Sequence, residues 1–162
     1  MPKMTEVVGY SDVIDVTLTP HTGANADNDV IAATQEITNV YRRVGGTIIL
    51  QSLILLDEDD QAVDVDIVFL NADGSVGAED AVFAPSDTVA RTIVGTVSIL
   101  SSSTPSQYVD SNTSQYAVKT GLGLIMKAGS NTTSLWVAAV CRSGTPTYTA
   151  AGLKLKLGIL RD

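Results

Sequence analysis

The chain has almost none of the residues on which most active sites depend. It contains one histidine, one cysteine and one tryptophan, and aromatic side chains make up 5% of its 162 residues. With a single histidine, a Ser-His-Asp site would have to use His21, and no GxSxG, P-loop or HExxH motif is present. We therefore expect no enzyme activity, no catalytic residues and no cofactor.

The two lone reactive residues have ordinary surroundings. Cys141 cannot form an internal disulfide, and its place in "LWVAAVCR" predicts a small buried thiol rather than a nucleophile. His21 lies in "LTPHTG", a stretch typical of a loop, and we expect it to be a solvated loop residue.

Long apolar runs and positive charge are also scarce. The longest apolar run, Thr47 to Leu56, is interrupted by Gln51 and Ser52 and is far shorter than the ~20 residues that span a bilayer. Met1 to Val8 lacks the apolar segment of a signal peptide. The net charge is −8, whereas phosphate binding requires a cationic surface. We expect a soluble protein made in a cytoplasm, with no membrane and no nucleic-acid partner.

The charge is unevenly distributed along the chain. Residues 1–110 hold 4 basic and 17 acidic side chains, and residues 111–162 hold 6 basic and 1 acidic. The split is consistent with oppositely charged faces within one fold or with subunits that meet head to tail.

Short strand-like segments separated by turn residues make up most of the chain. Val13 to Thr19 alternates apolar and polar residues, and two apolar runs on either side of "DEDDQ" predict a hairpin. The stretch Val30 to Arg43 is ambiguous, with a preference for extended structure. "APSDTVARTI" predicts one short helix capped by Ser86 or Asp87. The pattern predicts an all-β fold: an antiparallel β-sandwich of jelly-roll type with one short helix.

Six carboxylates lie within the ten residues from Asp57 to Asp66. An EF-hand loop starting at Asp57 would need Gly at 62 and Glu at 68, where the chain has Ala62 and Val68. The preferred interpretation is that Asp57 to Asp60 form a solvated hairpin tip and that Asp64 and Asp66 lie on an outer sheet face. We therefore predict no metal site. A calcium site at Asp57, Asp59 and Asp60 is the alternative, and a catalytic pair at Asp64 and Asp66 is the weakest interpretation.

The few aromatic residues allow a second function. Trp136 in "SLWVAAV" is typical of a core residue, but a sugar-stacking platform remains the alternative. With Tyr108, Tyr116 and Tyr148, it could supply the stacking surfaces of a carbohydrate- or receptor-binding module, such as one on a tail or fibre.

A further set of residues lies between Gly45 and Asp162: Gly45-Gly46, Gln51-Ser52, Asp57, Asp60-Gln61 and the strand ending at Phe69. The segments "GTPTYT" and "LGIL" follow near the end of the chain. In these features the chain resembles a family of small structural proteins of tailed bacteriophages that are encoded near the major capsid protein.

The resemblance implies a capsid decoration, or cement, protein. It would bind the major capsid protein on the exterior of the assembled head after synthesis in the host bacterial cytoplasm, as a homo-oligomer, most simply a trimer. We expect a single domain, with residues 1–44 forming an N-terminal arm and the first strands and residues 45–162 forming the sandwich core. The polar segment before Tyr41 is expected to become ordered on docking.

Overall fold

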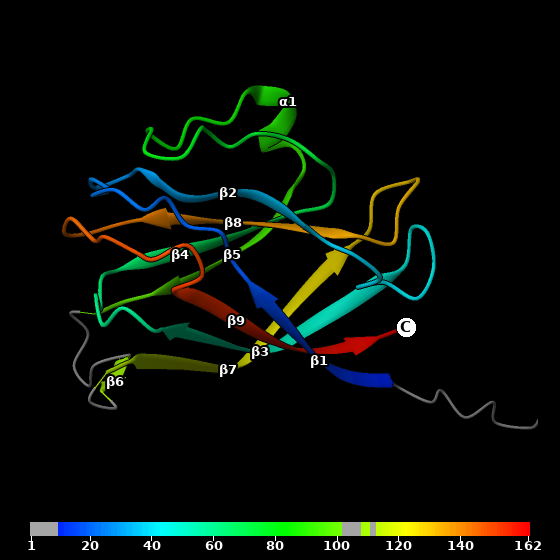
Figure 1. Cartoon of the computed structure of the whole chain (residues 1–162). Coiled ribbons are helices and arrows are strands. Elements are labelled where there is room, and N and C mark those ends of the chain that lie inside the picture. Colours follow the sequence, from blue (N-terminus) through cyan, green and yellow to red (C-terminus); the bar gives the residue numbers. More distant parts are fainter. Residues whose placement is uncertain (1–9, 102–107, 111–112) are drawn as a thin grey trace, which may run out of the picture.

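The computed structural model describes residues 10–101, 108–110 and 113–162, and these form nine strands and one short helix (Figure 1). In chain order the elements are β1 (Tyr10–Thr17), β2 (Val30–Ile37), β3 (Thr47–Asp57), β4 (Val65–Leu70), α1 (Asp87–Ala90), β5 (Ile93–Ile99), β6 (Tyr108–Asp110), β7 (Gln115–Lys127), β8 (Leu135–Cys141) and β9 (Leu153–Arg161). The all-β prediction is confirmed. Within the described part of the chain, no helix is long and apolar enough to cross a membrane.

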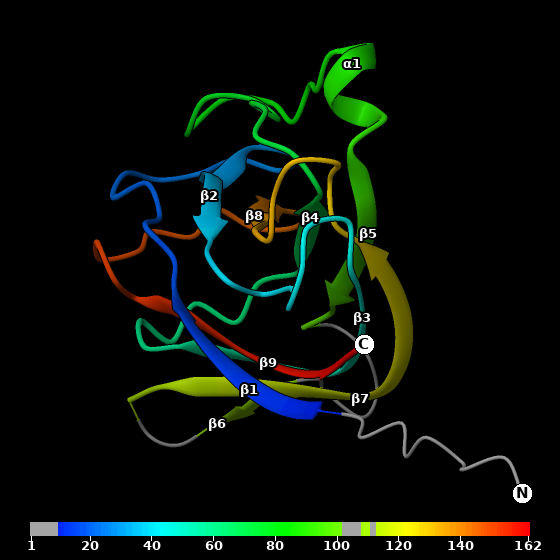
Figure 2. The ribbon, with the colours of Figure 1, turned by 90° about the vertical axis from the view of Figure 1, so that its right-hand side faces the viewer.

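The strands form two antiparallel sheets that face each other (Figure 2). One has the order β1-β9-β3-β7-β6, and the other has the order β2-β8-β4-β5. If the short β6 is set aside, the chain changes sheet at every connection except the one between β4 and β5. This order is that of a jelly roll, as the sequence predicted.

The strands β3 and β4 do not form the predicted hairpin. β3 pairs with β7 and β9, whereas β4 pairs with β5 and β8 in the other sheet. The turn between them therefore crosses from one layer to the other. Each strand has an apolar side that packs into the same core, Leu53 and Leu55 from one sheet and Ile67 and Phe69 from the other. Opposite layers are needed for such packing, and a flat hairpin would not provide them.

Residues 10–40 are already part of the two sheets. β1 pairs with β9 along its whole length, and β2 pairs with β8 with two irregularities in register. Val16, Leu18 and Ile31 are buried in the core. The expectation that the segment before Tyr41 becomes ordered only on docking is therefore wrong for these residues. The proposed division at residue 44 stays a prediction.

The connection between β4 and β5, residues 71–92, forms an additional layer outside the four-stranded sheet (Figure 1). Val76, Phe83 and Val89 from this connection pack with side chains such as Val68 and Val140 on the outer side of that sheet. Helix α1 lies here, and the Ser86 hydroxyl caps it by accepting a hydrogen bond from the Val89 N–H. Among the described residues, no comparable segment covers the outer side of the five-stranded sheet.

Candidate functional site

Asp57 organises the acidic turn that follows β3. Its side chain is fully buried. Oδ1 accepts a hydrogen bond from the Asp59 N–H at 3.1 Å, and Oδ2 accepts bonds from Gln61 and Ala62 N–H at 2.9 Å. Burial raises the pKa of this carboxyl, while the three backbone donors oppose the rise. The prediction of a solvated hairpin tip is wrong at Asp57, because the turn folds around this carboxylate.

The rest of the turn is tied to the loop between β8 and β9. Asp59 Oδ2 accepts a hydrogen bond from the Thr149 N–H at 2.8 Å, and the Thr149 hydroxyl is 3.1 Å from both carboxylate oxygens. Gln61 Oε1 accepts a bond from the Thr147 N–H at 3.0 Å. Hydrogen bonds therefore connect the acidic turn to the β8–β9 loop at one end of the sandwich.

The calcium alternative has little preformed geometry. In the part of the chain that the structure describes, no three His, Cys, Asp or Glu residues are grouped to hold a metal ion. Asp57 and Asp59 direct their oxygens at N–H and O–H donors, and Asp60 is exposed. The absence of a calcium site at Asp57, Asp59 and Asp60 stays a prediction.

Asp64 and Asp66 contact different partners rather than flanking a cleft. Asp64 Oδ1 accepts a hydrogen bond from the Ser101 hydroxyl at 2.7 Å. Asp66 Oδ2 lies 2.6 Å from Arg142 Nε, and its other oxygen accepts a bond from the Ser98 hydroxyl. These contacts are typical of carboxylates that stabilise strand ends and sheet faces.

No nucleophile approaches the single histidine among the described residues. His21 Nδ1 lies 4.0 Å from Asp80 Oδ1, and no described serine or cysteine hydrogen-bonds to the ring. Cys141 is fully buried, as predicted, and burial raises the pKa of its thiol. The thiol is therefore held in its protonated, unreactive form. That the protein is not an enzyme stays a prediction.

The four aromatic residues considered for sugar stacking are dispersed. Tyr108 and Tyr148 are buried in the core, and Tyr116 is exposed on the five-stranded sheet. Trp136 is half-buried on the outer side of the other sheet, against the cluster that contains Val68 and Leu70. These residues do not make one platform, so only Trp136 keeps the geometry for a separate binding site.

Exposed apolar side chains gather on the outer side of the five-stranded sheet. Its side chains alternate with the buried core residues along β3 and β9, and cross-strand pairing aligns them in rows. One row runs from Leu160 through Ile49 to Ile125, and another pairs Ile54 with Val118. We call this surface the apolar sheet face. It consists of Val13, Ile49, Ile54, Leu56, Val109, Tyr116, Val118, Ile125 and Leu160.

Exposure on this face is high for a folded protein. Ile125 is 67% exposed and Val13 is 63% exposed. Isolated exposed apolar residues are common, whereas several of them on one side of a sheet, here interrupted by Ser52 and Thr120, make a candidate surface for a partner. Sequence reasoning found the apolar runs and did not assign them to a surface.

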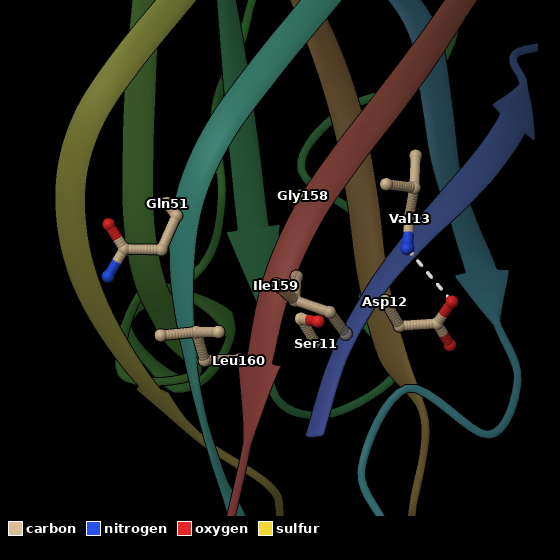
Figure 3. Close-up of a pocket in the computed structure, with 7 residues that line it drawn as sticks. All are labelled: Ser11, Asp12, Val13, Gln51, Gly158, Ile159 and Leu160. Carbon is tan, nitrogen blue, oxygen red and sulfur yellow. Dashed lines mark hydrogen bonds between the residues drawn. The ribbon is translucent and has the colours of Figure 1, made fainter. Parts of the chain in front are cut away.

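A shallow hollow of about 440 Å³ lies on the apolar sheet face, where β1, β9 and β3 run side by side (Figure 3). Val13, Gln51 and Leu160 surround it, and Gly158 forms part of its floor. A Cβ at Gly158 would collide with Ser52 Oγ, so glycine keeps the strands close there. The hollow could accept a protruding apolar side chain of a partner.

Charged groups also lie on this outer side, where Lys156 and Lys154 of β9 are the register partners of Ile54 and Leu56, and these lysines form ion pairs. Lys156 Nζ lies 2.6 Å from Asp15 Oδ1, and Lys154 Nζ lies 2.6 Å from Glu58 Oε1. Arg161 pairs with Asp12 in the same way. These pairs join acidic residues from the first part of the chain to basic residues from the last part. With Asp66–Arg142, such pairs involve four of the 17 acidic side chains of residues 1–110, so part of the charge split reflects pairing within the fold. Whether subunits meet head to tail stays a prediction.

Comparison with known proteins adds little. No family model matches the chain, and no curated protein matches it. Three solved structures are similar to nearly the whole chain. A chain of the tomato aspermy virus structure has a TM-score of 0.41 at 6% identity, with 99% of this chain and 81% of that chain covered. The structure of desmodium yellow mottle tymovirus has a TM-score of 0.31 at 14% identity, with 99% of this chain and 85% of that chain covered. The capsid of Ralstonia phage GP4 has a TM-score of 0.40 at 16% identity, with 100% of this chain and 89% of that chain covered. At these TM-scores the similarities carry no information about function.

Proposed function

We propose that this chain is a virion structural protein that decorates the exterior of an assembled phage head. In this proposal the apolar sheet face docks on the major capsid protein and reinforces the shell. The observation that carries it is the set of exposed apolar side chains on the outer side of the five-stranded sheet, which no other described segment covers. The phage assignment is supported by the sequence resemblance to proteins encoded near the major capsid protein.

Burial of the apolar sheet face would supply the docking energy. Apolar area removed from water contributes roughly 25 cal/mol per Å² before the costs of association. The ion pairs Lys156–Asp15 and Lys154–Glu58 mean that docking would bury these lysines with their charge partners rather than alone. This chemistry fits a partner with a matching apolar surface.

The opposite side of the molecule suits exposure to water. The 71–92 connection carries Asp73, Glu79, Asp80 and Asp87 and one basic residue, Arg91. Such a surface would repel packaged DNA, which favours the outside of the head over the inside. We accordingly place synthesis in the host cytoplasm and the mature protein on the capsid exterior.

We propose a homo-oligomer, most simply a trimer, on the strength of the family resemblance alone. Four of the six basic residues after position 110 are already paired with carboxylates of the same chain, which leaves little positive charge for contacts between subunits. Light scattering of the purified chain at micromolar concentration tests this proposal. A monomer mass would contradict it.

Binding to heads that lack this protein tests the docking proposal. Heads purified from a deletion strain of the encoding virus would be mixed with the purified chain and sedimented. Val13→Lys and Ile125→Lys would place a charge in the apolar sheet face, and we expect each to weaken binding at least tenfold. Val82→Lys is the matched control, because Val82 is 60% exposed on the covering layer of the other sheet. Equal binding by all three variants would reject the proposed surface.

The competing location is a phage tail or fibre, where the chain would act as a receptor-binding module. Electron cryomicroscopy of the virion separates the two locations. Density for this chain at a tail tip, or on the inner capsid wall, would overturn the decoration proposal.

A further inference from the structure

A second recess lies on the other sheet, where β4 ends and β8 begins. It has a volume of about 290 Å³, at the small end of ligand-binding clefts. We call it the Trp136 groove. The residues that define it are Trp136, Asn71, Asp73, Ser130, Asn131 and Thr132.

Trp136 forms the apolar part of the groove. In the register of the sheet it lies between Glu36 on β2 and Leu70 on β4. Leu70 and Val68 belong to the apolar cluster that supports it, and the indole is half-buried. The ring is therefore held in position while part of it still faces the groove.

The two loops that flank the indole are held firmly. Thr133 O accepts a hydrogen bond from the Tyr41 N–H, and Thr132 Oγ1 accepts one from the Ser134 N–H. The other loop, which follows β4, is held by a hydrogen bond from the Asn71 N–H to Thr92 O. At Gly129 the loops approach so closely that a Cβ would lie 2.5 Å from Asn71 O. The groove is thus formed before any ligand arrives, which lowers the entropic cost of binding.

The polar side chains of the groove are not used by the fold. Among the described residues, the side chains of Asn71, Asp73, Ser130 and Asn131 form no hydrogen bond, and neither does the Trp136 indole N–H. Amide, hydroxyl and carboxylate groups together offer both donors and acceptors. No Lys or Arg is among the described residues that line the groove, and Asp73 and Glu36 make its surroundings acidic.

We propose that the Trp136 groove binds a neutral saccharide. A sugar ring has an apolar C–H face that stacks on an indole, and its hydroxyls both donate and accept hydrogen bonds. The missing cation and the two nearby carboxylates disfavour phosphate, sulfate and sialic acid. The groove is on the sheet opposite the apolar sheet face, so this binding does not depend on the proposed decoration role and would remain possible on a docked protein.

The single tryptophan makes the test direct, because all indole emission comes from the groove. The full chain would be titrated with neutral oligosaccharides of glucose, galactose, mannose and N-acetylhexosamines, and with sialylated and sulfated counterparts. We expect at least one neutral sugar to change the emission of Trp136 with saturation. The acidic counterpart of that sugar should bind at least tenfold more weakly.

Two side-chain variants locate the site. Asp73→Ala and Asn131→Ala should each weaken binding of the responding sugar about tenfold without changing the melting temperature. Asp27→Ala is the control, because Asp27 is exposed and lies outside the groove. The proposal is overturned if no panel member changes the emission up to about 10 mM, beyond the roughly millimolar range of weak binding. Tighter binding of the acidic sugars, or equal binding by Asp73→Ala and Asn131→Ala, would overturn it too.

Discussion

At the residue scale, Asp57 shows how one acidic side chain determines the path of the chain between the two sheets. A carboxylate has two acceptor oxygens, whereas an amide or an alcohol side chain has one, so only a carboxylate can accept N–H donors at both ends of its head group. Asp57 accepts three backbone bonds where the chain leaves β3 and crosses to the other layer. Its role is to satisfy a buried turn.

Replacing this carboxylate should destabilise the fold. Asp57→Asn would place an NH₂ group against at least one of the buried N–H donors and leave those groups unsatisfied. We expect the free energy of unfolding to fall by about 2–3 kcal/mol, measured by urea denaturation. Asp60→Asn is the matched control at an exposed position of the same turn, and it should stay within about 0.5 kcal/mol of the parent. Equal, small effects of both variants would contradict the structural role of Asp57.

The raised pKa of Asp57 predicts a pH dependence with a definite sign. Because the folded state holds this proton more tightly than the unfolded chain, the folded state is favoured at low pH, and this advantage is lost as the pH rises through the raised pKa. The stability of the parent relative to Asp57→Asn should therefore shrink as the pH rises from below the ordinary pKa of an aspartate through the raised pKa of Asp57, by ~1.4 kcal/mol per unit of pKa difference. Urea denaturation across this range provides the measurement. If the difference in unfolding free energy between the parent and Asp57→Asn grew with pH, the three N–H donors would lower the pKa of Asp57 by more than burial raises it.

The burial of a residue could be predicted where its neighbours in the sequence are apolar. The role of a residue could not be predicted where it depends on partners distant in the sequence. Cys141 lies in an apolar run, and that alone predicted burial. The acidic turn looked solvated because charge runs usually are, whereas Asp59 and Gln61 bond to Thr149 and Thr147, almost ninety residues away. No local pattern reports that contact.

At the element scale, most strands could be found from the sequence, and their pairing could not. β1 was predicted by its period-2 alternation, and β2 by its β-branched residues. The runs that became β3 and β4 looked like a hairpin because they are adjacent and joined by turn residues. Which strands pair depends on packing across the core, where Leu55 and Ile67 come from opposite layers.

The layer formed by residues 71–92 should contribute to stability through its buried side chains. Val76 is fully buried in the cluster on the outer side of the four-stranded sheet. Val76→Ala removes two methyl groups from that cluster, and we expect it to cost about 1–3 kcal/mol in urea denaturation. Val82→Ala, at an exposed position of the same layer, should change stability by less than about 0.5 kcal/mol. If Val76→Ala were equally harmless, the layer would be no more than a loosely attached loop.

At the scale of the whole molecule, the two sheets differ in what lies outside them. The run Thr47 to Leu56 is apolar on both sides of β3, a pattern that predicts a strand covered on both faces. In the described part of the chain, only its inner side is covered. The apolar residues of this surface could be seen in the sequence. That the 71–92 connection covers the other sheet instead could not be predicted, because it depends on the jelly-roll order of the strands.

If the apolar sheet face docks on the head, the stability of the head should depend on the concentration of free protein. A ligand that binds the assembled lattice and not the separated subunits stabilises the lattice by mass action, about 2.7 kcal/mol per site at a hundredfold excess over its Kd. Heads lacking the protein should therefore lose their integrity at a temperature that rises steadily as the chain is added, followed by light scattering or dye access to the packaged DNA. Val82→Lys should give the same curve as the parent, and Val13→Lys should require at least tenfold more protein for the same rise. A disruption temperature that stays constant while the protein demonstrably sediments with the heads would mean that it binds the head without reinforcing it.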